Sequence, residues 1–261
     1  MKLEKHELLA AVIELVQEAG EAVMRIYESD DFDVKLKSDH SPLTKADLAA
    51  NEIITKGLRK LAPNIPVVSE EALLSDEERL ASSSFWLVDP IDGTKEFIKK
   101  NGQFTLNVGL IEDGEPVLGV VYAPARDVLY YGGRGLGAWK ERDGHKEKIQ
   151  VADGSRPLIA VGSLSHPSPA AAAWLQDQGV AEIVSVGSSL KLCYVSEGAA
   201  DVYPRIDAHL SDWDIAAADA VLRAAGGLCE VFETGETLRY DRPTLKLPHF
   251  LVRSKHVLIT R

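Results

Sequence analysis

The sequence predicts an α/β (α+β) protein built from two layered halves. Two stretches near the N-terminus have the apolar spacing of amphipathic helices, and a series of short β-prone segments follows them. After residue 154, strand-like and helix-like segments alternate. Consecutive strands joined by tight turns indicate an antiparallel sheet, whereas alternation with helices is typical of a layered α/β unit.

The N-terminal segments read as two helices with a hairpin between them. Residues 3–27 keep helical apolar spacing, so we expect one long amphipathic helix. Residues 30–42 are polar and alternating, which favours a short hairpin or a mobile flap. A second helix is expected from Thr44, because Thr44 and Asp47 have capping-box spacing, with Asp in place of the usual Glu or Gln; Pro63 should end it.

The middle third is expected to form a mostly antiparallel sheet. Glu112-Asp113-Gly114-Glu115 is a strong hairpin signal between two strands. We expect the strand before Asp89 to stop there, because Pro90 cannot donate to a regular ladder. The expected strands cover residues 66–69, 85–89, 105–111, 117–122 and 128–132.

The remainder of the chain predicts a second half. Residues 152–157 are rich in turn-forming types and form a short pivot, so we divide the chain into an N-terminal α+β half, 1–153, and a C-terminal α/β half, 154–261. Strands are expected at residues 158–161, 183–186, 202–204, 228–232 and 250–252, and helices at 169–178, 188–198 and 215–225.

Composition excludes several classes of protein. The net charge is −11, from 29 basic and 40 acidic residues, which argues against non-specific nucleic-acid binding. No apolar run approaches the roughly 18 residues of a membrane-spanning helix, and the charged N-terminus does not resemble a secretory signal. The 2 cysteines indicate no disulfide framework. We therefore expect a cytoplasmic protein without an integral membrane segment; peripheral association at the inner membrane stays open.

The run Asp89-Pro90-Ile91-Asp92-Gly93-Thr94 carries the strongest functional signal. Two carboxylates at the end of an apolar strand are costly to bury unless a cation meets them. Glu70 ends another β-prone run, and Asp214 stands where an alanine-rich helix begins. Carboxylate oxygens suit Mg²⁺, and four carboxylates could hold two ions. A bound divalent ion would also reverse the negative local potential that opposes a phosphate substrate.

Each of these residues also has a purely structural interpretation. Asp89 and Asp92 could belong to a type I turn, and Asp214 could stabilise a helix N-terminus. The backbone amides of Gly93-Thr94 could bind an anion. The same two residues could also be no more than the end of an ordinary turn. Asp47, taken alone, is better explained as a helix cap. Solvated or turn roles are expected for Asp207 and Asp212, and surface positions for His40, His166 and His209.

A third segment, Gly187-Ser188-Ser189-Leu190-Lys191, opens an expected helix. Small residues and a lysine at a helix start could bind an anion or a nucleotide. A simple helix cap is an equally ordinary explanation, so the residues alone leave both roles open.

Several motifs in order along nearly the whole chain resemble the inositol monophosphatase superfamily of magnesium-dependent, lithium-sensitive phosphomonoesterases. They are Thr44-Lys45-Ala46-Asp47, Ser69-Glu70-Glu71, the Asp89–Thr94 run, and Trp213-Asp214-Ile215-Ala216-Ala217-Ala218-Asp219. Lys95-Glu96-Phe97-Ile98 and the segments 187–191 and 197–205 are similar to the 3'(2'),5'-bisphosphate nucleotidases of the CysQ type, whereas inositol phosphatases usually have Thr-Asn-Phe after the Gly-Thr. The resemblance implies a layered α/β/α/β/α sandwich of the inositol monophosphatase/fructose bisphosphatase type. Residues 207–211 match no motif of the family.

The resemblance also implies roles for individual residues. One Mg²⁺ would be held by Glu70, Asp89 and the Ile91 carbonyl, and a second by Asp89, Asp92 and Asp214; two or three ions per site are expected. Thr94, held by Asp47, would orient the attacking water with help from Glu70. The remaining expected substrate contacts are Gly93 and Thr94 at the phosphate, with Gly187, Ser188 and Lys191 near the nucleoside.

These roles imply a phosphatase that converts 3'-phosphoadenosine 5'-phosphate to AMP and phosphate, which would clear a by-product of sulfate assimilation. An inositol-1-monophosphatase or another sugar phosphatase is the alternative with the same chemistry. A non-catalytic metal- or phosphate-binding regulator is a different class, and it is disfavoured because no expected metal carboxylate is missing. The expected partner is a small phosphorylated nucleotide, bound by a monomer or a homodimer, with no nucleic acid.

Overall fold

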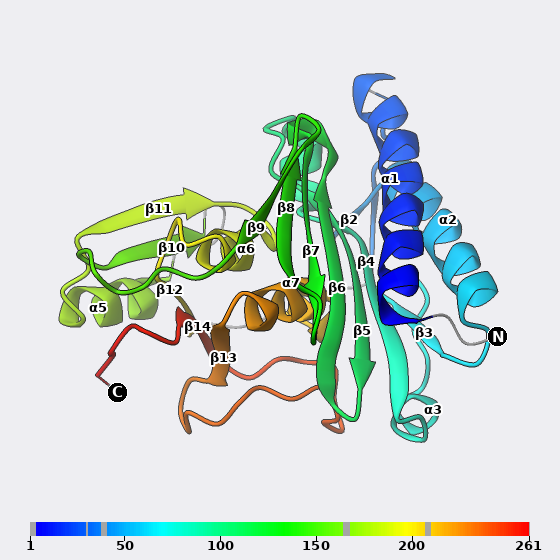
Figure 1. Cartoon of the computed structure of the whole chain (residues 1–261). Helices are drawn as coiled ribbons and strands as arrows, with labels where there is room; N and C mark the ends of the chain where they lie inside the picture. Colours follow the sequence, from blue (N-terminus) through cyan, green and yellow to red (C-terminus); the bar gives the residue numbers. More distant parts are fainter. Residues whose placement is uncertain (1–3, 30, 38–40, 164–167, 207–209, 261) are drawn as a thin grey trace.

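The computed structural model describes residues 4–29, 31–37, 41–163, 168–206 and 210–260. Within this part of the chain the elements form five layers, α/β/α/β/α, as the resemblance implied. The helices are α1 (Lys5–Ser29), α2 (Lys45–Leu61), α3 (Asp76–Leu80), α4 (Thr94–Ile98), α5 (Pro169–Asp177), α6 (Leu190–Ser196) and α7 (Asp212–Ala224). Figure 1 shows α1 and α2 along one face of the larger sheet and α7 beside its other face.

The two N-terminal helices form where the apolar spacing predicts them. The buried face of α1 includes Leu8, Val12 and Val16, which pack with α2 against the sheet. Thr44 and Asp47 make the expected capping box at the start of α2. The expected hairpin is also present as strands β1 (Lys35–Leu36) and β2 (Pro42–Leu43), which pair antiparallel.

The larger sheet has the strand order β3-β4-β5-β6-β7-β8-β9. Only the β3–β4 pair is parallel, so the expectation of a mostly antiparallel sheet is confirmed, together with the hairpin between β5 and β6. The sequence did not predict the hairpin of β8 and β9 or the short helix α3. The strands are β3 (Val67–Ser69), β4 (Ser84–Asp92), β5 (Thr105–Glu112), β6 (Glu115–Ala123), β7 (Val128–Gly133), β8 (Gly137–Arg142) and β9 (His145–Ile149).

The expectation that the strand stops at Asp89 is wrong, because β4 continues to Asp92. Its pairing with β5 shifts register between Asp89 and Asp92, and it resumes where Asp92 faces Thr105. This irregularity accommodates Pro90, which has no N–H to donate to the ladder. The strand therefore carries both carboxylates on its last four residues.

The second sheet has the order β11-β10-β12-β14-β13 and closes the C-terminal part of the fold. Strand β10 pairs parallel with β11 and β12, whereas β14 pairs antiparallel with β12 and β13. The expected alternation of strands and helices is confirmed. The strands are β10 (Ile159–Ser163), β11 (Glu182–Val186), β12 (Val202–Arg205), β13 (Gly227–Val231) and β14 (Phe250–Ser254).

Helix α7 lies very close to the larger sheet, and glycine permits this. A Cβ atom on Gly119 of β6 would stand 2.0 Å from the Ala217 carbonyl oxygen. A Cβ atom on Gly109 of β5 would stand 3.0 Å from the Ala217 backbone nitrogen. The close approach brings the first turn of α7 to the end of β4. Among the described residues, no helix combines the length and the hydrophobicity needed to cross a membrane.

Candidate active site

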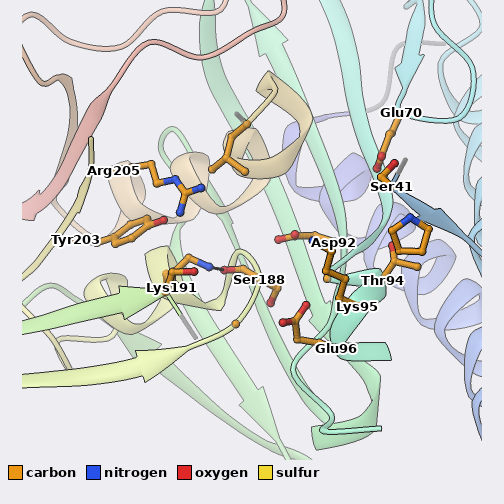
Figure 2. A pocket seen from close by; sticks show the side chains of 15 residues that line it. Ser41, Glu70, Asp92, Thr94, Lys95, Glu96, Ser188, Lys191, Tyr203 and Arg205 are labelled. Carbon is orange, nitrogen blue, oxygen red and sulfur yellow. Dashed lines mark hydrogen bonds between the residues drawn. The ribbon is translucent and has the colours of Figure 1, made fainter. Parts of the chain in front are cut away.

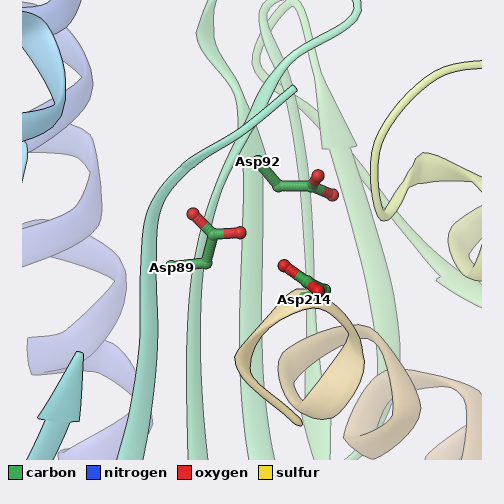
Figure 3. Close-up of side chains that lie close together, drawn as sticks. All are labelled: Asp89, Asp92 and Asp214. Carbon is green, nitrogen blue, oxygen red and sulfur yellow. The ribbon is translucent and has the colours of Figure 1, made fainter. Parts of the chain in front are cut away.

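Three carboxylates from distant parts of the chain meet at the end of β4. Asp89 and Asp92 come from the last residues of β4, and Asp214 comes from the first turn of α7. One oxygen atom from each of the three lies within 4.8 Å of the others. Figure 3 shows the carboxylates directed toward a common space. Asp214 also accepts a 2.6 Å hydrogen bond from the Ser211 backbone N–H, so it caps the helix and faces the cluster at once.

Burial and mutual repulsion make this cluster costly for a protein without a cation. Burial, followed by the charges of Glu70, Asp92 and Asp214, raises the pKa of Asp89 well above its usual value. Burial raises the pKa of Asp92 to about 6 and that of Asp214 to about 8. Oδ1 of Asp89 is buried and has no hydrogen-bond partner among the described residues. An acceptor of this kind, in a set of hard oxygen donors, fits a divalent cation such as Mg²⁺.

Glu70 lies next to this cluster but outside the close group of three. It follows β3, and its side chain contributes to the raised pKa of Asp89. Lys37, which directly follows β1, donates to Glu70 at 2.7 Å and to Glu71 at 2.5 Å. Burial alone would lower the pKa of Lys37, but its hydrogen bonds to Glu70 and Glu71 outweigh burial and raise it. A cation beside the hairpin therefore already balances part of the charge of this acidic pair.

Thr94 stands between the carboxylate cluster and helix α2. Its hydroxyl lies 3.3 Å from Oδ1 of Asp47 and 3.3 Å from the Ile91 carbonyl oxygen. Gly93 precedes it in the left-handed conformation, with φ of 92°, which a residue with a Cβ atom rarely adopts. Burial raises the pKa of Asp47, although hydrogen bonds from Thr44 oppose this shift. The predicted pairing of Asp47 with Thr94 is present.

A cavity of about 190 Å³ opens over these residues and is lined by both halves of the chain (Figure 2). The first half contributes Ser41, Pro42, Glu70, Asp92, Gly93, Thr94, Lys95 and Glu96, and the second contributes Ser163, Gly187, Ser188, Lys191, Tyr203, Arg205 and Leu210. The cavity thus joins the carboxylates of Glu70 and Asp92 to the predicted substrate contacts, while Asp214 lines a smaller cavity that shares Asp92 and Lys191 with it.

The wall opposite the carboxylates is cationic and aromatic. The Lys191 ammonium donates to the Ser188 carbonyl oxygen at 2.6 Å and lies 5.7 Å from the centre of the Tyr203 ring. Burial lowers the pKa of Lys191, although the charge of Asp92 opposes this shift. Arg205 is also largely buried at this wall. Sequence reasoning assigned no role to Tyr203 or Arg205; the signal available was a basic residue at the end of a buried strand.

Two expectations need correction or refinement. Asp212, expected to be a solvated or turn acid, is fully buried and pairs with Arg242, because the first turn of α7 is covered by a later loop. The Gly187 backbone N–H, expected near a nucleoside, donates to Oε1 of Gln103 at 2.7 Å. Its amide therefore already has a partner within the protein. Asp207, His40, His166 and His209 lie outside the described residues.

Comparisons with known proteins identify the family of the chain. The family model described as "Inositol monophosphatase family" matches residues 4–259. The 3'(2'),5'-bisphosphate nucleotidase CysQ of Salmonella typhimurium is 47% identical over 247 residues, covering 94% of this chain and 99% of the relative. The corresponding protein of Escherichia coli K12 is 47% identical over 220 residues, covering 84% of this chain and 88% of the relative.

Solved structures give the same result for the fold. The crystal structure of CysQ from Bacteroides thetaiotaomicron, described as a bacterial member of the inositol monophosphatase family, has a TM-score of 0.84 and 39% identity, covering 95% of this chain and 97% of that chain. The IMPase of Thermotoga maritima has a TM-score of 0.79 and 26% identity, covering 96% and 93% of the two chains.

Proposed function

Because the chain belongs to the inositol monophosphatase family, we propose that it is a magnesium-dependent phosphatase of 3'-phosphorylated 5'-nucleotides. The relatives that are named 3'(2'),5'-bisphosphate nucleotidase match most of its length at 47% identity. The substrate we propose is 3'-phosphoadenosine 5'-phosphate, which the enzyme hydrolyses to AMP and phosphate. One observation carries this proposal: a single cavity is lined on one side by the carboxylates of Glu70 and Asp92 and on the other by two cations, Lys191 and Arg205.

The proposed metal ligands are Asp89, Asp92 and Asp214, with Glu70 and the Ile91 carbonyl completing the set. The orphaned oxygen of Asp89 and the raised pKa values of the cluster support this assignment. When bound, two or three Mg²⁺ ions supply the positive charge that neutralises a phosphate dianion and makes water more acidic. As a metal ligand, Glu70 would contact Mg²⁺ in place of its present partner, Lys37.

Thr94 is the proposed orienting group for the attacking water. Its hydroxyl donates to Asp47, which leaves an oxygen lone pair to accept a hydrogen bond from a water in the cavity. Glu70, on the same cavity wall, would accept a proton from that water. Gly93 keeps the backbone close to the phosphate because it has no side chain. Glu70, Gly93 and Thr94 all line the cavity, and Asp47 contacts Thr94.

The cationic wall is the proposed contact for the rest of the nucleotide. Lys191 and Arg205 present positive charge across the cavity from the carboxylates, so they can bind a second phosphate that is not cleaved. Ser188 and Gly187 lie beside them, although the Gly187 amide is held by Gln103. An inositol monophosphate has no second phosphate for this wall, which favours the nucleotide over the sugar ester.

The test is phosphate release from 3'-phosphoadenosine 5'-phosphate and from inositol 1-phosphate, each measured with and without magnesium. A preference for the nucleotide that disappears without magnesium is the expected result. A preference for inositol 1-phosphate would keep the metal chemistry and overturn the substrate assignment. No magnesium-dependent release from either ester would contradict the proposed activity.

We propose that the enzyme works in the cytoplasm as a monomer or homodimer, takes a small nucleotide as partner and binds no nucleic acid, in line with its net charge of −11. The proposed halves, 1–153 and 154–261, divide the site so that Asp214, Lys191 and Arg205 belong to the second half.

A further inference from the structure

Three buried polar side chains connect the two halves of the protein beneath the cavity. Thr105 and Asn107 lie two residues apart on strand β5, so they point to the same face of the sheet. Ser189 approaches them from the loop before α6. Thr105 and Asn107 are completely buried, and Ser189 is 2% exposed. Leu106 and Val108, on the opposite face of β5, pack in the apolar layer with the N-terminal helices.

The hydrogen bonds among these three side chains form a closed ring. Oγ of Ser189 lies 2.7 Å from Oδ1 of Asn107, Oγ1 of Thr105 lies 2.9 Å from Oγ of Ser189, and Nδ2 of Asn107 lies 3.1 Å from Oγ1 of Thr105. The Asn107 amide oxygen can only accept, so Ser189 donates to it. Thr105 must then donate to Ser189, and Asn107 donates to Thr105. Each side chain donates once and accepts once.

The backbone that this ring anchors carries contacts of the site. The backbone of Ser189 lies beside Asp92, a proposed metal ligand, on one small cavity, and its hydrogen bond to the Asp92 carboxylate opposes the rise in the pKa of Asp92. The preceding carbonyl, that of Ser188, accepts the hydrogen bond of the Lys191 ammonium at 2.6 Å. Ser188 adopts the left-handed conformation, with φ of 52°, which is unfavourable for a residue with a Cβ atom and must be held by its surroundings.

The Ser189 hydroxyl does not accept a capping hydrogen bond from helix α6. Ser189 is the N-cap residue of α6, where a serine hydroxyl normally accepts a hydrogen bond from the first turn of the helix. Here the side chain makes no such bond and joins the ring on β5 instead. At the start of α6 the Leu190 backbone N–H instead lies 3.5 Å from the Ser188 hydroxyl, and the Ser189 hydroxyl connects the loop at residues 187–191 to β5.

We propose that the Thr105–Asn107–Ser189 ring is a positioning element that holds the loop at residues 187–191 in register with Asp92. Through this loop it fixes the Ser189 amide on the metal-binding carboxylate and the Lys191 ammonium at the cationic wall. The two functions of the cavity, metal binding and substrate binding, therefore depend on one buried ring. The inference rests on the proposed metal-dependent phosphatase activity, which it refines by adding three positioning residues that do not line the cavity.

The test compares Thr105→Val, which removes the hydroxyl and keeps the shape, with Thr105→Ser, which keeps the hydroxyl. Three quantities are measured for each full-length variant: kcat and KM for 3'-phosphoadenosine 5'-phosphate, Mn²⁺ binding without substrate by electron paramagnetic resonance, and Tm. Hydrogen-bond partners behind metal ligands typically change metal affinity about 10- to 100-fold. Thr105→Val should weaken Mn²⁺ binding and raise KM in that range, and Thr105→Ser should stay within about twofold of the wild type.

Two further variants keep the test decisive. Ser189→Ala breaks the ring without changing β5, so it should reproduce the effect of Thr105→Val even if the strand variant folds poorly. Thr55→Val is the matched control, because it removes a nearly buried hydroxyl from α2 that donates to the Asn51 carbonyl at 2.7 Å. It should lower Tm without changing Mn²⁺ affinity or KM.

The outcomes separate this inference from the proposed function. Unchanged Mn²⁺ affinity and KM in Thr105→Val and Ser189→Ala would overturn the positioning role, as would equal shifts in Thr55→Val. A wild-type chain that binds Mn²⁺ but does not hydrolyse the nucleotide would overturn the proposed substrate. The Mn²⁺ comparison between the variants would then still decide the role of the ring.

Discussion

Asp47 uses its two carboxylate oxygens for different partners. Oδ2 accepts hydrogen bonds from the Thr44 backbone N–H at 2.7 Å and from the Thr44 hydroxyl at 2.6 Å, while Oδ1 faces the Thr94 hydroxyl at 3.3 Å. From the sequence, a helix cap and a catalytic role were alternatives for this residue. The geometry lets one side chain cap α2 and contact the Thr94 hydroxyl at once, because the start of α2 adjoins the segment that follows Asp92.

We expect Asp47→Asn to lower kcat by about 100-fold, a typical contribution of proton-transfer groups, with a much smaller change in KM. An amide in place of the carboxylate no longer fixes the direction of the Thr94 hydroxyl proton. Thr44→Ala is the control: it removes one part of the capping box and should cost about 1 kcal/mol of stability, measured by urea unfolding, with kcat retained. Equal losses of kcat in both variants would contradict the catalytic role and show that Asp47 acts only as part of the helix cap.

Asp92→Asn and Asp214→Asn should each reduce magnesium-dependent turnover by at least about 100-fold while the fold survives. Each change removes a proposed ligand and also removes a charge that raises the pKa of Asp89. The Tm of the metal-free variants, measured by calorimetry in EDTA, should therefore be higher than that of the metal-free wild type. Asp241→Asn changes an exposed acid that pairs with Arg239 and should leave turnover unchanged. Near-normal activity in either site variant would refute the ligand assignment.

Stability without metal should fall as pH rises from about 4 to about 8. The pKa of Asp214 is raised by burial from 3.8 to about 8, and that of Asp92 to about 6. In this range the unfolded chain has released protons that the folded chain still binds, so rising pH favours unfolding. Magnesium should stabilise the protein more at pH 8 than at pH 5, because the ion must displace fewer protons. Urea unfolding with EDTA or magnesium at both pH values measures this; equal magnesium stabilisation at the two would contradict it.

Arg205→Met should raise KM for 3'-phosphoadenosine 5'-phosphate by about 10- to 100-fold, the range expected for one lost hydrogen bond to a charged group. The effect on adenosine 3'-monophosphate, which lacks the second phosphate, should be small. The measurement is the ratio of kcat/KM for the two substrates. Arg142→Met, which changes an exposed arginine on the distant strand β8, is the matched control. Equal losses on both substrates in Arg205→Met would assign the residue a structural role.

Local signals in the sequence were sufficient for much of the fold. The capping box at Thr44 and the turn at residues 112–115 depend on neighbouring residues, and both form as expected. Strands β8 and β9 were missed because side chains such as those of His145–Ile149 are mostly exposed at a sheet edge, so they show no apolar alternation. Asp212 was misjudged because its partner, Arg242, is 30 residues away and only the tertiary fold brings the two together.

The site, too, has residues that the local sequence predicts and residues that only the tertiary fold brings together. Asp89 and Asp92 could be recognised from their spacing on one strand, whereas their meeting with Asp214 depends on how closely α7 approaches the sheet. The sequence places Ser189 inside an expected helix, residues 188–198, and nothing local indicates that its hydroxyl faces Asn107. Contacts of this kind cross between sheets and have no signature in residue order.

The close seating of α7 against Gly109 and Gly119 makes the protein a natural candidate for a split enzyme. A cut between residues 153 and 154 would leave Asp89 and Asp92 on one fragment and Asp214 on the other, so neither fragment alone could assemble the carboxylate cluster. Turnover would return only when the helix of one fragment packs against Gly109 and Gly119 of the other. Phosphate release would then report the association of any two proteins to which the fragments are fused.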